Sequence, residues 1–109
     1  MPTALKVLGQ SVPSAASLTT LYTVPALTST ICSSVVVCNQ SATPTSFRIA
    51  VRPAGASIDP KHYLYYDVPI AGNDTFVATI GITLATTDIV SVYATLATVS
   101  FNLFGSENT

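Results

Sequence analysis

Helical periodicity is nearly absent from this sequence, and that absence is the feature that most narrows the possible folds. Short runs of β-branched and aromatic residues are separated instead by Pro, Gly and Asn about every dozen residues, which is typical of a sandwich or barrel. We expect about seven strands, at residues 18–24, 30–38, 45–52, 61–68, 74–82, 88–95 and 98–104. The pattern predicts an all-β fold, a single antiparallel β-sandwich of jelly-roll type.

The predicted sandwich covers residues 18–105, and a short segment flanks it on each side. Residues 1–17 look like an extended arm because Pro2 and Pro13 break any helix, and residues 106–109 look like a polar tail. The arm either adds a strand to the sheet edge of a neighbouring subunit or completes its own domain as an edge strand. Its candidate interface residues are Leu5, Val7 and Leu8.

Side chains alternate between two sides of each predicted strand, which separates an inner face from an outer one. In residues 45–52 we expect the inner side to carry Phe47, Ile49 and Val51. Arg48 and Arg52 then share the outer side, about 13 Å apart along the strand. One of them can pair across the sheet with a carboxylate, from Asp67 or Asp88. The alternative is that the two arginines anchor a contact with another subunit, because arginine is enriched at protein interfaces.

Three tyrosines form the densest aromatic cluster of the chain, Tyr63-Leu64-Tyr65-Tyr66. Alternation places Tyr63 and Tyr65 on one face of the strand and the other two residues on the opposite face. One face meets the core, and the other meets either solvent or a neighbouring subunit, since tyrosine combines a large contact area with a polar tip. Tyr63 and Tyr65 are therefore candidate interface residues. A stacking site for sugars or bases is a further alternative.

Charged residues are scarce, and this limits the classes of partner. They make up 8% of the chain, against about 25% in an average globular protein. Nucleic acid is not an expected partner, because binding it requires a cluster of Lys and Arg and the chain has four such residues. No segment approaches the roughly 18 apolar residues of a membrane helix, so no membrane partner is expected. A surface poor in charge and rich in Ser and Thr suggests faces that partners cover.

Neither the N-terminal residues nor the cysteines indicate an oxidising compartment. Residues 1–16 lack the continuous apolar stretch of a secretory signal, so we expect folding in a reducing cytoplasm. Cys32 and Cys38 are six positions apart, which places them on one face of a straight strand at a separation of about 20 Å. That separation exceeds the reach of a disulfide, so two free thiols are expected.

The residue patterns indicate neither catalysis nor a bound metal ion or cofactor. His62 is the single histidine and has Asp59 and Asp67 nearby, but the G-x-S-x-G pattern of a serine hydrolase is lacking. Two cysteines and one histidine are too few for a zinc site. Asp74 and Asp88 stand at junctions between turn and strand, where a carboxylate accepts backbone N–H bonds. We therefore expect a non-enzymatic protein without cofactors.

Several segments of the chain are distinctive when taken together. They are Thr20-Leu21-Tyr22-Thr23-Val24-Pro25, Val35-Val36-Val37-Cys38-Asn39, Arg48-Ile49-Ala50-Val51-Arg52-Pro53, Tyr63-Leu64-Tyr65-Tyr66-Asp67, the stretch 84–92 with Asp88, and Phe101-Asn102-Leu103-Phe104-Gly105. In combination they resemble the small β-sandwich virion structural proteins of tailed bacteriophages, including phages of cyanobacteria. The resemblance covers most of the chain, from residue 18 to residue 105, and its motifs are structural and not catalytic.

The resemblance implies a place in a virus particle. Proteins of this kind serve as capsid decoration (cement) proteins or as small tail and baseplate components, often as symmetric oligomers. We expect a decoration protein, made in the host cytoplasm, that joins the virion as a homo-oligomer (a trimer is favoured) and stabilises the assembled head by binding the major capsid protein. The alternatives are a tail or baseplate component that contacts tail proteins, and a module that binds a host-surface glycan or receptor through Tyr63 or Tyr65 with loop carboxylates.

Overall fold

The computed structural model describes residues 3–109 as two antiparallel β-sheets with two short 3-10 turns. The strands are β1 (Thr3–Ser11), β2 (Thr19–Thr23), β3 (Ser29–Asn39), β4 (Thr45–Arg52), β5 (Tyr63–Ile70), β6 (Thr75–Ala78), β7 (Ile82–Leu84), β8 (Ile89–Ala94) and β9 (Val99–Asn108). The turns η1 (Pro53–Gly55) and η2 (Pro60–His62) both lie between β4 and β5. Sheet A has the strand order β1-β9-β3-β6, with β7 also paired to β3, and sheet B has the order β2-β8-β4-β5.

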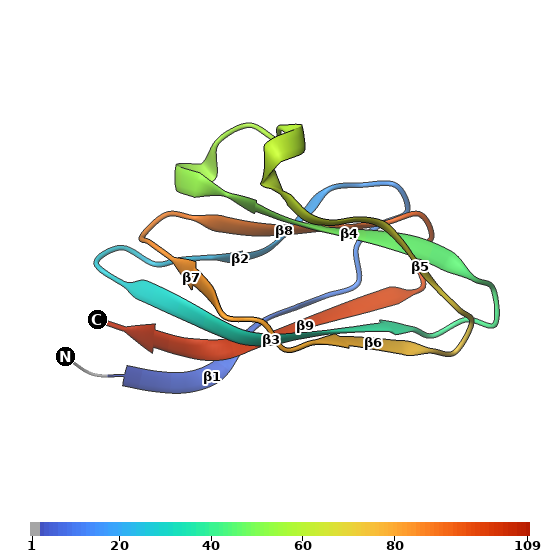
Figure 1. Cartoon of the computed structure of the whole chain (residues 1–109), viewed down its shortest axis with the longest axis horizontal. Coiled ribbons are helices and arrows are strands. Elements are labelled where there is room, and N and C mark those ends of the chain that lie inside the picture. Colours follow the sequence, from blue (N-terminus) through green and yellow to red (C-terminus); the bar gives the residue numbers. More distant parts are fainter. Residues whose placement is uncertain (1–2) are drawn as a thin grey trace.

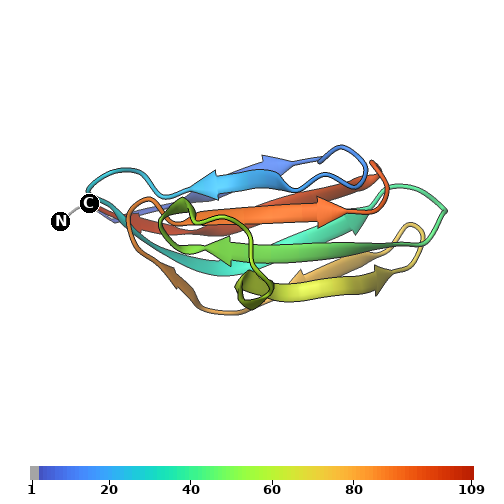
Figure 2. The same cartoon turned by 90° about the horizontal axis from the view of Figure 1, so that it is seen from above.

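The two sheets lie face to face, as Figure 1 shows, and most connections pass from one sheet to the other. In Figure 2 the strands of both layers run along the long axis of a molecule that measures 45 × 27 × 20 Å. Among the described strands, consecutive ones change sheet everywhere except at β4–β5 and β6–β7. Two antiparallel sheets linked in this way have the arrangement of a jelly roll. The predicted all-β antiparallel sandwich is therefore confirmed.

The differences from the predicted organisation lie at the two ends of the chain and in one strand. The predicted strand at 74–82 is divided into β6 and β7. The segment predicted as an arm forms β1, which pairs with β9 of the same domain, so the alternative of an edge strand holds; residues 1–2 of that segment lie outside the described residues. The predicted tail is also wrong, because β9 continues to Asn108. Local alternation cannot reveal this pairing, whose partners lie at opposite ends of the chain.

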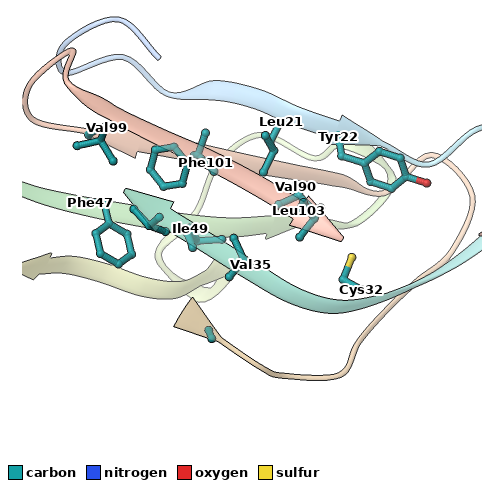
Figure 3. Close-up of a cluster of buried hydrophobic side chains, with 14 of the residues drawn as sticks. Leu21, Tyr22, Cys32, Val35, Phe47, Ile49, Val90, Val99, Phe101 and Leu103 are labelled. Atoms are coloured by element: carbon teal, nitrogen blue, oxygen red, sulfur yellow. The ribbon is translucent and has the colours of Figure 1, made fainter. Parts of the chain in front are cut away.

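The core fills the space between the sheets with side chains from both of them, as Figure 3 shows. Phe47 of β4 is fully buried, and its ring centroid lies 5.2 Å from that of Phe76 and 6.0 Å from that of Phe101. Burying a side chain of this size contributes about 1.5–3 kcal/mol. The inward set predicted for residues 45–52 is confirmed, because Phe47 and Ile49 are buried and Val51 packs against the core.

A β-bulge in β3 reverses the predicted placement of one cysteine. The pairing of β3 with β9 shifts between Cys32 and Ser34, and the extra residue exchanges the two faces of the strand beyond that point. Cys32 is therefore buried at 1% exposure, whereas Cys38 lies on the outer side between buried neighbours. The prediction that both share one face is wrong, but both are free thiols. Burial raises the pKa of the Cys32 thiol to about 11, which makes it unreactive near neutral pH.

Asn39 joins three loops at one end of the sandwich. Its side chain is fully buried, and its amide donates to the carbonyl oxygens of Thr43 and Ala71 at 2.8 and 3.2 Å. Its carbonyl oxygen accepts from the Ser41 N–H and from the Thr98 hydroxyl. A buried amide with four partners costs little to desolvate, because each bond lost to water is replaced.

Glu107 joins the two sheets at the other end. Its carboxylate accepts hydrogen bonds from the Tyr22 hydroxyl of sheet B and from the Lys6 ammonium at 2.9 Å. The Tyr22 hydroxyl also lies 2.8 Å from the Thr30 hydroxyl of sheet A. The Glu107 side chain lies on the inner side of β9. The Lys6–Glu107 ion pair, the one ion pair within the described strands of sheet A, therefore does not lie on the outer face of that sheet.

Candidate interaction surfaces

The outer face of sheet B carries an arginine held between two tyrosine rings. The Arg48 guanidinium carbon lies 4.2 Å from the ring centroid of Tyr66 and 4.3 Å from that of Tyr93. Its Nε donates to Asp67 at 2.6 Å, and a second nitrogen donates to the same carboxylate at 3.3 Å. This hydrogen bonding raises the pKa of Arg48, so the group stays charged. The predicted pairing of one arginine with Asp67 across the sheet is confirmed.

A bulge in β5 brings Tyr66 and Asp67 to the same arginine. Phe47 pairs with Val68 and Ile49 pairs with Tyr65, so β5 has one residue more than β4 over this stretch. Asp67 takes a left-handed conformation there, with φ of 52°, which Asp tolerates better than most residues. Sequence alternation missed Tyr66 as a partner of Arg48 because a strand with an extra residue no longer alternates.

A second irregularity separates Tyr63 from Tyr65. Tyr65 pairs with the buried Ile49, whereas Tyr63 pairs with Ala50 on the outer side, so the prediction that the two tyrosines share a face is wrong. Tyr65 packs against the core, with its ring centroid 5.4 Å from that of Phe76. Tyr63 contacts Tyr66 edge to face at 4.9 Å. The outward aromatic pair is therefore Tyr63 and Tyr66.

The loop before β5 completes a shallow pocket beside these two rings. The pocket has a volume of about 490 Å³ and is lined by Ile58, Asp59, Pro60, Tyr63 and Tyr66. One Asp59 oxygen accepts the Lys61 N–H at 3.2 Å, and the Asp59 N–H donates to Nδ1 of His62 at 3.0 Å. His62 itself is buried, at 7% exposure, so its role here is to fix the loop.

The outer face of sheet A has no charged side chain among the described residues, and exposed apolar side chains lie there beside polar ones. Its exposed apolar side chains are Leu5, Val7, Ile31 and Val77. The strand register aligns them: Leu5 and Ile31 both pair with Ser106, Val7 pairs with Phe104, and Val36 pairs with Val77. Sequence analysis missed the contributions of β3 and β6, although the run Val35-Val36-Val37 is a signal, since consecutive apolar residues in a strand indicate cover on both faces.

The three apolar residues predicted in the arm do not all face outward. Leu5 and Val7 are exposed at 85% and 47%, but Leu8 packs against the core. The register of β1 shifts between Val7 and Gly9, so that adjacent residues change sides. Leu8 is therefore not an interface residue, and this part of the prediction is wrong.

The remaining predicted polar residues stabilise loops. Arg52 donates to the Ser91 hydroxyl at 3.1 Å and to the Ala56 carbonyl at 3.0 Å, which holds the segment that follows β4. Asp88 accepts the N–H groups of Ala54 and Ala85, and Asp74 accepts the N–H of Thr75. The predicted capping role of both carboxylates is confirmed.

Residues 3–109 contain no group of three or more His, Cys, Asp or Glu side chains that could hold a metal ion. Within the same range no helix has the length and apolarity needed to cross a membrane. No protein-family model matches the chain, and no curated protein is significantly similar to it. The features that bear on function are therefore the outer faces of sheets A and B.

Proposed function

We propose that this chain is a non-enzymatic structural protein of a tailed-phage virion, a capsid decoration subunit that binds the assembled head as a homo-oligomer, with a trimer favoured. The observation that carries the proposal is the outer face of sheet A, which has exposed apolar side chains on three strands and no charge among the described residues. The virion setting is supported by the sequence resemblance. Two-sheet jelly rolls recur in viral capsid domains, although a fold by itself does not fix a function.

The occupant that this face fits best is a second copy of the same chain. Around the axis of a symmetric oligomer the same side chains of every copy come close together, so like charges on that surface repel. Sheet A avoids this cost because its two charged side chains, Lys6 and Glu107, bind each other on the inner side of the sheet and leave the outer face of the described strands without charge. The outer face of sheet B, in contrast, carries Arg48 and Asp67. Sheet A therefore suits contacts between subunits, and sheet B remains available to other partners.

The proposed mechanism is thermodynamic. An oligomer that binds the assembled shell and not its free subunits stabilises the shell by mass action. Several subunits that bind at once add avidity, because each further contact forms at a high effective concentration. This mechanism needs no reacting group. Cys32 and His62 are both buried and have no part in it.

The test is the position of the protein on purified particles. Immunogold electron microscopy with an antibody against this chain should place gold over the whole head. Gold at one end only would contradict decoration and would assign the chain to the tail or baseplate. No gold, with an antibody proven on blots, would overturn the virion proposal for the particle surface.

A further inference from the structure

The pocket at the start of β5 has the size and lining of a small-molecule site. Its volume of about 490 Å³ falls in the range of roughly 300–1,000 Å³ that is usual for ligand pockets. Ile58, Pro60 and the two tyrosine rings supply apolar surface, and Asp59 supplies a carboxylate. Apolar walls with one or two fixed polar groups are the usual composition of such sites.

The pocket is held in shape without a ligand. On the loop side, Asp59 is fixed by its bonds to the Lys61 N–H and to the buried His62, and the ring of Pro60 restricts the backbone between them. On the strand side, Tyr66 contacts both the ring of Tyr63 and the Arg48 guanidinium. A site that is already ordered loses little conformational entropy when it binds.

The charges around the pocket select against ionic ligands. A cation on Tyr66 would meet Arg48, which already lies 4.2 Å from the centre of that ring and stays charged. An anion would meet the Asp59 carboxylate, which lines the pocket. Arg48 would attract an anion only weakly, because its guanidinium is already paired with the Asp67 carboxylate. The ligand that remains is neutral, with an apolar face for the rings and hydroxyl groups for the carboxylate.

We propose that this pocket binds a neutral saccharide. The C–H groups of a pyranose ring pack on the aromatic surfaces of Tyr63 and Tyr66, and a sugar hydroxyl donates to the Asp59 carboxylate. A hydrogen bond to a charged acceptor is stronger than one between neutral groups, which fixes the orientation of the sugar. The site lies on sheet B and its loop, away from the apolar face of sheet A, so it does not depend on the proposed oligomer.

The experiment is an NMR titration of the isolated protein with methyl glycosides of glucose, galactose, mannose and N-acetylglucosamine. At least one should give saturable shifts at Tyr63 and Tyr66, with a dissociation constant of roughly 1 mM. Tyr66→Ala should weaken binding about tenfold. Asp59→Asn, in which the amide still accepts the Lys61 N–H, should weaken it several-fold. Leu27→Ala, a change at an exposed loop residue outside the pocket, should leave the affinity unchanged.

Two results would overturn the saccharide site. One is the absence of saturable shifts with all four glycosides up to about 50 mM, well above the affinity of weak sites. The other is an affinity that Tyr66→Ala does not change, when the spectrum shows that this variant is folded. Tetramethylammonium belongs in the same titration, because saturable binding of that cation without sugar binding would make the pocket a cation site. Particle labelling is measured separately, so either proposal can fail alone.

Discussion

Glu107 is a nearly buried carboxylate whose charge is stabilised by two donors from different strands. Its hydrogen bonds with Tyr22 and then with Lys6 lower the pKa of Glu107. Burial, and after it the bond to Glu107, raise the pKa of the Tyr22 hydroxyl to about 12. The contact between the sheets therefore requires an ionised Glu107 and a protonated Tyr22. Both conditions hold at neutral pH.

Acid should remove the stability that Glu107 contributes. A carboxyl with a lowered folded-state pKa contributes stability above its unfolded value of about 4.3 and loses it as the pH falls through the folded value. Glu107→Gln should lower the free energy of unfolding by about 1–3 kcal/mol at pH 7, because the amide replaces a charged acceptor. It should also flatten the dependence of that free energy on pH below about 5.

Urea denaturation over a series of pH values measures both effects. Asp59→Asn is the matched control, because it removes an exposed carboxylate and keeps the cap on Lys61. If Glu107→Gln and the unsubstituted protein lose stability equally between pH 5 and pH 2, the bond to Tyr22 does not stabilise the ionised form.

Single residues were predictable where a partner of opposite charge lay on the next strand along the chain. Arg48 and Asp67 met this condition, since β4 and β5 form a hairpin pair and carry opposite charges. Glu107 did not, because its partner Tyr22 lies 85 positions away and in the other sheet. Such contacts depend on how the sheets stack, which local pattern does not determine.

At the scale of the strand, bulges decide which side chains reach the surface. Alternation predicted the inner face of β4 correctly, because the pairing of that strand with β8 is regular. It failed at Cys38, at Tyr63 and at Leu8, and each of these follows or lies in a register shift. One inserted residue reverses every later side chain. Alternation along β5 therefore could not identify Tyr63 and Tyr66 as the outward pair.

Gly105 permits the bulge between β3 and β9. It pairs with Cys32, and a Cβ atom at this position would lie 2.1 Å from the Ile31 carbonyl oxygen. Because that atom is backbone, Gly105→Ala requires the two strands to separate. We expect a loss of about 2 kcal/mol or more in the free energy of unfolding. Gly81→Ala is the control, since a Cβ there meets nothing within 4 Å. Equal urea midpoints for the two variants would show that the strands tolerate the Cβ.

At the scale of the whole molecule, the two outer faces differ in chemistry. Sheet B carries an arginine, a carboxylate and tyrosines that hydrogen-bond or pack with one another. Sheet A carries exposed apolar side chains and, within residues 3–109, no charge on its outer face, and Leu5 and Val77 are among these apolar side chains. Exposed apolar patches of this kind mark sites of association in soluble proteins. The outer face of sheet A therefore accounts for much of the charge-poor surface that the composition indicates.

The proposed self-association through sheet A predicts that oligomeric state and thermal stability change together. Sedimentation should give a species of three times the mass of one chain, and the melting temperature should rise with protein concentration, because association stabilises only the folded state. Ile31→Lys places a charge on the outer face of sheet A and should yield monomers, with an affinity lowered about tenfold or more. Leu27→Lys adds the same charge at a loop residue that is 91% exposed and should leave the mass unchanged. A monomer at all concentrations, or an oligomer that Ile31→Lys leaves intact, would show that copies of this chain do not meet through sheet A.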